Sequence, residues 1–111
     1  MKHLLYLLLL TSLFASPGER LKLIHADELE NITDEKGNTV QHLRGNVKFR
    51  KGEATITAER AYYRNREEIG SFVHNVRMEE DQKVLTADSV VINSRQDIAT
   101  SFGNTHFADE E

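Results

Sequence analysis

Histidines are the first side chains in this sequence that could do chemistry, and their spacing limits what they can do. His25, His42, His74 and His106 have no histidine two or four positions away, and the sequence contains no cysteine. A zinc site needs three or four such ligands, usually in closely spaced pairs. We therefore expect no metal and no cofactor.

Three carboxylates recur at equivalent places in the sequence. Asp27, Glu59 and Asp88 each follow an alanine. Carboxylates in register could bind calcium or act as the paired acids of a glycoside hydrolase. A carboxylate that recurs with the period of the fold is better explained by the fold, so we expect these side chains to face water at a corner and to cap turn N–H groups. No serine elbow, phosphate loop or activated cysteine accompanies them, and we expect no enzyme activity.

These carboxylates belong to a unit that occurs three times. Each copy begins near one of the acids and ends near an asparagine, and Asn46, Asn75 and Asn104 follow one another at equal intervals. The first copy is slightly longer, and the polar segment 34–38 absorbs the difference. The repeat indicates three similar structural units stacked side by side.

Apolar and polar residues alternate within each copy, as expected for a strand with one buried face. In the segment 43–50 the leucine, glycine, valine and phenylalanine point one way, and the charged and amide residues point the other way. Phe72, His74, Val76 and Met78 repeat this pattern in the second copy. Because β-branched and aromatic residues dominate at a period of two, the pattern predicts an all-β fold.

The alternation changes phase once inside each strand pair. Ala58 and Ala61 are apolar but three positions apart, so we expect a bulge or corner at Glu59-Arg60 that returns both to one face. The same shift recurs in the third copy. Long antiparallel strands that each contain a corner, and that are apolar on one face, predict two facing sheets with a groove between them. Turns are expected at four polar segments, residues 51–53, 64–66, 80–82 and 93–95.

The N-terminus has the layout of a secretory signal peptide. A positive start precedes an apolar run at 4–15, which ends at Pro17 and Gly18. The run is shorter than the about 20 residues that a membrane-spanning helix needs. We therefore expect a signal peptide at 1–18 and one β domain at 19–111, with an inner-membrane anchor as the alternative if the signal is not cleaved.

Composition excludes one class of partner. The sequence has 14 Lys and Arg against 18 Asp and Glu, and its net charge is −4 at pH 7. Such a surface repels phosphate backbones, so a nucleic-acid partner is not expected. Without cysteine there is no disulfide framework, and stability must come from strand pairing, burial or association.

An ordered set of motifs runs through the repeats: Ala-Asp-Glu at 26–28, Gly-Asn-Val at 45–47, Ala-Glu-Arg-Ala-Tyr-Tyr at 58–63 and Ala-Asp-Ser at 87–89. This set resembles the OstA-like or LptA-like N-terminal domain of lipopolysaccharide transport, and the resemblance covers residues 21–107. Three positions depart from the family pattern. His74 replaces the second glycine, Thr105 the third valine and Glu59 the second aspartate.

The resemblance implies an open half-jelly-roll, or β-taco, that carries the acyl chains of lipopolysaccharide in its apolar groove across the periplasm of a Gram-negative cell. It also implies end-to-end stacking with related β-taco proteins or with itself, and membrane association only through partners or an uncleaved signal. The chain is shorter than the typical bridge member, so a component akin to the anchored LptC is an alternative role. The side chains expected to face the lipid are Val47, Phe49, Ile56, Ala58, Tyr63, Phe72, Val76, Met78, Leu85, Val90, Ile92 and Phe107.

Other interpretations of the same residues stay open at this point. The inward side chains would equally fill a closed core. A structural β-module that docks protein partners through its edge strands would show the same alternation. A periplasmic carbohydrate-active domain is a third class, but such domains usually present aromatic platforms, and this sequence has no tryptophan.

Overall fold

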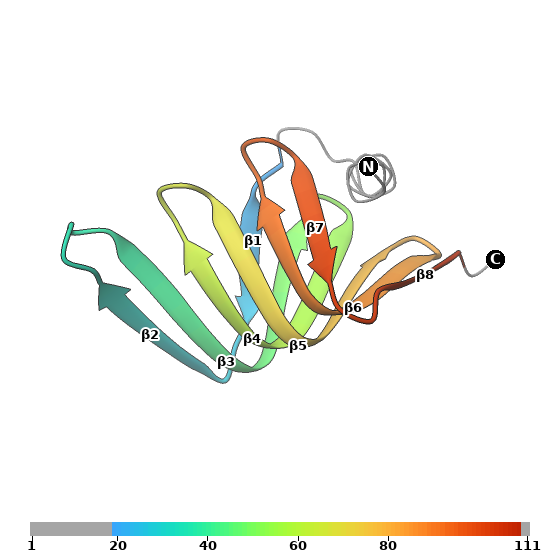
Figure 1. Cartoon of the computed structure of the whole chain (residues 1–111), viewed down its shortest axis with the longest axis horizontal. Helices are drawn as coiled ribbons and strands as arrows, with labels where there is room; N and C mark the ends of the chain where they lie inside the picture. Colours follow the sequence, from blue (N-terminus) through green and yellow to red (C-terminus); the bar gives the residue numbers. More distant parts are fainter. Residues whose placement is uncertain (1–18, 110–111) are drawn as a thin grey trace.

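The computed structural model describes residues 19–109, which form one open antiparallel sheet of eight strands (Figure 1). The strands are β1 (Leu21–His25), β2 (Glu28–Thr33), β3 (Thr39–Lys51), β4 (Ala54–Arg64), β5 (Ile69–Glu80), β6 (Lys83–Asn93), β7 (Ile98–Phe102) and β8 (His106–Asp109). The expected all-β class is confirmed. Within these residues there is no helix long and apolar enough to cross a membrane. The signal peptide expected at 1–18 lies outside the described residues.

The sheet has four long central strands and two divided edges. Strands β3, β4, β5 and β6 follow one another as hairpins and pair along most of their length. At one edge, β1 pairs with one half of β3 and β2 with the other half. At the other edge, β7 and β8 divide β6 in the same way. The breaks in both edge strands lie level with irregularities in the central strands, so one line of corners crosses the whole sheet.

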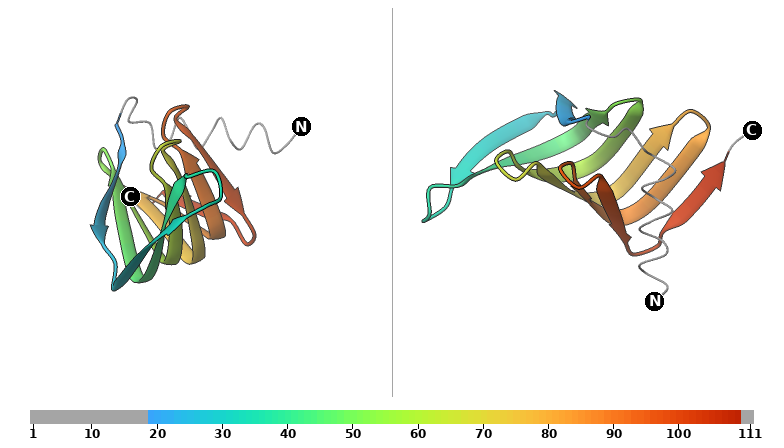
Figure 2. Two further views of the ribbon diagram at one scale, coloured as in Figure 1. Left: turned by 90° about the vertical axis from the view of Figure 1, so that its left-hand side faces the viewer. Right: turned by 90° about the horizontal axis from the view of Figure 1, so that it is seen from above.

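This line of corners divides the sheet into two arms. Arm 1 contains β1, β8 and the halves of the central strands that end at the turns 52–53 and 81–82. Arm 2 contains β2, β7 and the halves that end at the turns 34–38, 65–68 and 94–97. The arms rise from the corners toward the same side, so that the sheet is bent on itself (Figure 2).

The faces of the two arms that look toward each other form the hydrophobic core. Phe49 of arm 1 packs edge-on against Phe72 of arm 2, with 5.2 Å between the ring centroids, and it also packs against Tyr63 of arm 2 at 5.6 Å. Both phenylalanines are fully buried. A large apolar side chain stabilises a fold by roughly 1.5–3 kcal/mol when it is fully buried. The core therefore holds the arms together.

In the first copy the alternation in the sequence predicted the faces of the strand correctly, except at Gly45, which lies in a bulge with a φ of +80°. Leu43, Val47 and Phe49 are buried, whereas Arg44 and Lys48 are exposed. The four predicted turns are also present, between the central strands and before β7. In the second copy the prediction that His74 points inward is wrong. His74 is exposed and has a φ of +70°, because it belongs to a bulge in β5.

The corner expected at Glu59-Arg60 is confirmed, but the inserted residues lie on the neighbouring strands. Glu59 and Arg60 are both exposed between two buried alanines of β4. Arg44 pairs with Arg60 and Val47 pairs with Ala58, so β3 has one residue more than β4 between these two pairs. The extra residue lies at Gly45-Asn46. Strand β5 shifts in the same way at His74 and the residue after it. These positions have positive φ angles, which bend a strand strongly.

Candidate functional site

The predicted lipid-facing residues come together between the arms, as one continuous layer. Eleven of the twelve are buried there: Val47, Phe49, Ile56, Ala58, Tyr63, Phe72, Val76, Met78, Leu85, Val90 and Ile92. Six further members of this layer were not among the predicted lipid-facing residues: Leu21, Leu43, Ala54, Ala61, Ala87 and Ala99. The alternation had already placed Leu43, Ala61 and Ala87 on the inward face, whereas Leu21, Ala54 and Ala99 were not identified. In the centre of the sheet these side chains fill the space between the two arms.

The twelfth residue, Phe107, lies on the expected face but is not buried. It is opposite Leu85 of the core, which places both side chains on the inner face, yet 43% of its surface is exposed. Two residues at the other edge behave in the same way. Leu23 and Leu29 are opposite buried residues of β3 and are themselves exposed. The apolar inner layer therefore reaches both open edges of the sheet and is accessible there.

The tips of the arms are joined by charged side chains. The Lys51 ammonium, at the end of β3 in arm 1, donates to Asp97 Oδ1 of arm 2 at 2.9 Å. Arg20, which precedes β1, donates to Glu68 Oε1 in the turn 65–68 at 3.0 Å. Leu21 packs beside Gly70 just below this second ion pair, since a Cβ on Gly70 would lie 3.1 Å from its methyl carbon. The side of the core opposite the corners is thus covered.

A further carboxylate lies beside the first of these ion pairs. Glu80 ends β5 in arm 1, and one of its oxygens, Oε1, is buried with no hydrogen-bond partner. Burial raises the pKa of Glu80, and nearby Asp81 and Glu53 raise it further, whereas Lys83 and Lys51 lower it. The pairing of β3 with β4 and of β4 with β5 puts Ala54 between Lys51 and Glu80 on the inner face. Lys51 therefore has a carboxylate on its own arm as well as one on the opposite arm.

The repeated acids stand on the outside of the corners, and each accepts a hydrogen bond from an asparagine. Asp27 Oδ2 accepts from Asn46 Nδ2 at 3.0 Å. Asp88 and Asn104 make the same bond at 3.0 Å, and Glu59 and Asn75 make it in the middle copy. The prediction that these acids face water at a corner is confirmed. Their donors at the corners include side-chain amides, which the sequence reasoning had not considered.

Asp27 has a second contact. His25 Nε2 lies 2.9 Å from Asp27 Oδ1. The hydrogen bond with His25 lowers the pKa of Asp27 most, and the bond from Asn46 lowers it further. The first corner is therefore held by a carboxylate that is charged at neutral pH.

The acid and the corner residue of each copy fit each other sterically. A Cβ on Gly45 would lie 2.5 Å from Asp27 Oδ2, and a Cβ on Gly103 would lie 2.4 Å from Asp88 Oδ2. Neither position can hold a side chain beside an aspartate. In the middle copy the corner residue is His74, and its acid is the longer Glu59. The two departures from the family pattern thus occur together, in one copy and at one corner.

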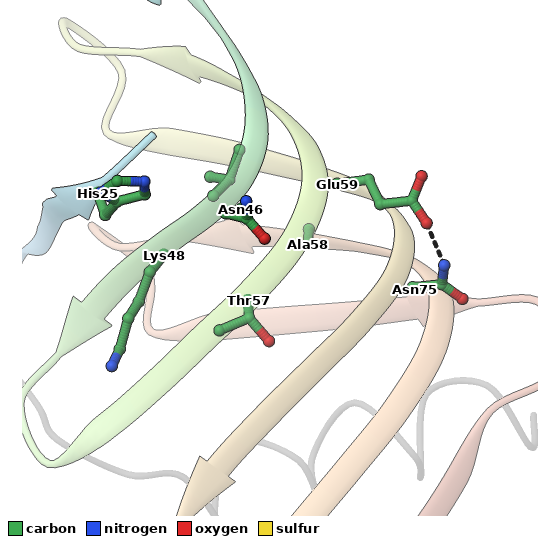
Figure 3. Close-up of a pocket in the computed structure, with 8 residues that line it drawn as sticks. His25, Asn46, Lys48, Thr57, Ala58, Glu59 and Asn75 are labelled. Atoms are coloured by element: carbon green, nitrogen blue, oxygen red, sulfur yellow. Dashed lines mark hydrogen bonds between the residues drawn. The ribbon is translucent and has the colours of Figure 1, made fainter. Parts of the chain in front are cut away.

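A hollow of about 370 Å³ lies on the outer side of the corners (Figure 3). Its polar side chains include Lys48, Thr57 and two of the corner asparagines. Asn75 is bonded to Glu59 in this view, and Asn46 is bonded to Asp27. Within residues 19–109 no three His, Cys, Asp or Glu side chains lie close enough together to hold a metal ion. The hollow is lined by His25, Asn46, Val47, Lys48, Thr57, Ala58, Glu59 and Asn75.

No protein-family model matches this sequence, and no curated protein matches it. The features of this protein that bear on its function are the inner layer, its accessible ends and the motifs of the repeat.

Proposed function

We propose that this protein binds the acyl chains of lipopolysaccharide between its two arms and transfers them along a series of similar sheets in the periplasm. The observation that carries the proposal is the accessible inner layer at both edges. A closed core has no need of exposed apolar side chains at its ends, whereas a conduit needs apolar contact where one unit passes the chain to the next. Leu23 and Leu29 lie at one edge and Phe107 at the other.

The shape of the sheet supports the same proposal. One antiparallel sheet, bent along a line of corners with its apolar face inside, is consistent with the half-jelly-roll, or β-taco, that the sequence motifs suggest. The signal peptide proposed at 1–18 would deliver the protein to the periplasm. If the signal were retained, the same inner layer would serve an anchored component of the LptC kind. The proposal requires no catalysis and no cofactor.

The edges of the sheet support the second part of the proposal, which is stacking. Among the described strands, β1 and β2 pair only with β3, and β7 and β8 pair only with β6. Each edge thus has backbone groups that another strand could pair with. An end-to-end neighbour, either a related protein or a second copy, would extend the sheet and cover Leu29 and Phe107 at the junction.

One observation favours a second candidate. The centre of the inner layer is packed, and Phe49, Ile56 and Phe72 have no exposed surface. A packed core of this kind is sufficient for a purely structural β-module that docks partners through its edges. The two candidates differ in whether lipid contacts the inner face.

Two phenylalanines of similar exposure allow a direct test. Phe107 is 43% exposed on the inner face, and Phe102 is 52% exposed and opposite Ser89 on the outer face. We would replace each in turn by a photocrosslinking phenylalanine analogue in cells that express the full chain. We expect lipopolysaccharide to be crosslinked at position 107 and not at 102. Equal crosslinking at both positions, or none at 107, would leave the structural module as the better account.

The absence of cysteine makes the stacking proposal testable as well. Leu23→Cys and Phe107→Cys proteins would be mixed under mild oxidation, because these two inner-face residues lie in the opposite edge strands of the same arm, β1 and β8. End-to-end stacking brings opposite edges together, so we expect the mixed dimer to form in excess over either symmetric dimer. Symmetric dimers alone would contradict this arrangement.

A further inference from the structure

The ion pairs at the arm tips differ from the core beneath them because they are contacts between charged side chains. The Lys51 side chain is only 9% exposed, and that of Asp97 is 31% exposed. Burying charges in a pair often stabilises a fold no more than apolar residues of the same size would. The charged closure therefore suggests a contact that opens rather than one that only stabilises.

Each of the two ion pairs has one partner that is more buried and one that is more accessible to water. In the first pair Lys51 is the buried partner, and in the second Glu68 is the buried partner. Asp97 and especially Arg20 are more exposed. When the arms separate, the exposed partners can be hydrated, and only the buried partners need a new counterion.

Both buried partners have such a counterion on their own arm. Glu68 Oε2 already accepts from Arg95 Nε at 3.3 Å, within arm 2. Lys51 has Glu80 on the same face of arm 1, separated from it by the small side chain of Ala54. One oxygen of Glu80 is buried and has no hydrogen bond in the closed arrangement. Breaking a buried ion pair is costly when it leaves a buried charge without a partner. Opening the arms avoids this cost, because Lys51 and Glu68 each keep a counterion on their own arm.

We propose that Lys51 is a two-position latch. It closes the arms by pairing with Asp97 and holds them open by pairing with Glu80, so that an acyl chain enters sideways between the turns 52–53 and 94–97. This inference rests on the proposed function for the identity of the ligand. The movement itself is a property of the sheet and can be measured without lipid.

The first experiment measures the distance between the arm tips. Glu53 and Gln96 are exposed and lie in the facing turns of arm 1 and arm 2. Spin labels on cysteines at these two positions would report the distance by electron paramagnetic resonance. We expect a short and a long distance in the unchanged background. Asp97→Asn should favour the long distance, and Glu80→Gln should favour the short one, each by at least about threefold in the population ratio.

The opposite signs distinguish a latch from a structural ion pair. Glu80→Gln replaces a partly buried carboxylate by a neutral amide of the same size, so thermal unfolding should show equal or greater stability. A purely structural role predicts no change in the tip distance from this substitution. A single distance that neither variant shifts would overturn the latch.

The second experiment connects the latch to lipid. In the Lys51→Cys/Asp97→Cys protein, a short bifunctional thiol reagent would fix the tips together. The same protein before crosslinking, and each single variant treated with the reagent, are the matched controls. With fluorescent lipopolysaccharide as the probe, we expect the crosslinked protein to load at least about tenfold more slowly than its uncrosslinked form.

The outcomes separate the two proposals. Equal loading before and after crosslinking would show that lipid does not pass between the tips, and the latch would be rejected while lipid binding stands. If Asp97→Asn and Glu80→Gln shift the tip distance but lipopolysaccharide is not bound by any form, the latch is supported and the proposed ligand is wrong.

Discussion

The centre and the two edges of the inner layer are built from the same repeat but are covered differently. Phe49 and Phe72, in the central strands, are fully buried because each arm has the other arm above it. Leu29 and Phe107 lie on the same face, at the edges, and remain partly exposed. Figure 1 places their strands, β2 and β8, at opposite ends of the sheet. Position in the sheet, rather than residue type, thus decides whether an inner side chain is core or accessible surface.

The largest expected effect comes from placing a charge on each part of the layer. Val76→Asp puts an unpaired carboxylate into the packed centre, where desolvation costs several kcal/mol, a large part of the stability of a small domain. We expect this variant to be unfolded in urea titrations at neutral pH. Phe107→Asp, at the edge, should stay folded and lose only lipid contact. Similar stability of the two variants would abolish the distinction between centre and edge.

A smaller effect is expected from removing volume. Phe49→Ala leaves a cavity between the arms and should cost about 3–5 kcal/mol of unfolding free energy. Leu29→Ala removes a side chain that is largely in water, and we expect less than about 1 kcal/mol. Chemical denaturation of both proteins would measure the difference. If Leu29→Ala proved equally destabilising, the first edge would be covered in solution, for example by a neighbouring copy.

The next prediction concerns the corners, where the first and third copies carry glycine and the middle copy carries His74. Gly45→Ala would force a Cβ against the Asp27 carboxylate, in a backbone conformation that side chains rarely adopt. We expect a loss of about 1–3 kcal/mol, measured by thermal or chemical unfolding. Gly37→Ala is the matched control, because Gly37 has a similar φ of +83° and nothing within 4 Å of an added Cβ. Equal losses would mean that backbone strain alone explains the glycine at this corner.

The smallest expected effect is a pH dependence at the first corner. The folded pKa of Asp27 is lowered by the hydrogen bonds from His25 and Asn46, so the stability that it contributes is present above the unfolded value of 3.8. This contribution should be lost as the pH falls through the folded pKa. An NMR titration of the Asp27 carboxyl carbon should give a midpoint below 3.8, and the Asp27→Asn protein should lack this part of the acid dependence. A midpoint above 3.8 would contradict the hydrogen-bonded corner.

The sequence predicted which face each strand presents, because alternation is a local property of the chain. It identified Val47 and Phe49 as inward residues, and it found the corner in β4 from the odd step between two alanines. It failed at His74, because a bulge adds a residue that simple alternation does not count. The role of Asn75, as the donor to the acid in its copy, needed the register between β4 and β5.

The coverage of each side chain could not be predicted in the same way. Phe107 is in phase with the core, but its exposure depends on where the opposite arm ends. Lys51 and Asp97 are far apart in the sequence, and nothing in their surroundings indicates that they meet. Their contact exists only because the sheet bends. It therefore depends on the bends at all the corners together and on no single segment of the chain.

The pairing of acid and corner residue has a consequence for how such a chain can grow. Each copy carries its own corner residue, its own acid and its own asparagine, and the acid accepts a hydrogen bond from the asparagine of the next corner along the chain. A duplicated copy would therefore bring a complete joint with it and would fit between existing copies without altering them. Exchanging only one residue of a joint, such as His74→Gly while Glu59 is kept, would combine the corner residue of one type of joint with the acid of the other. Length is thus an adjustable property of this architecture, whereas the composition of each joint is inherited as one unit.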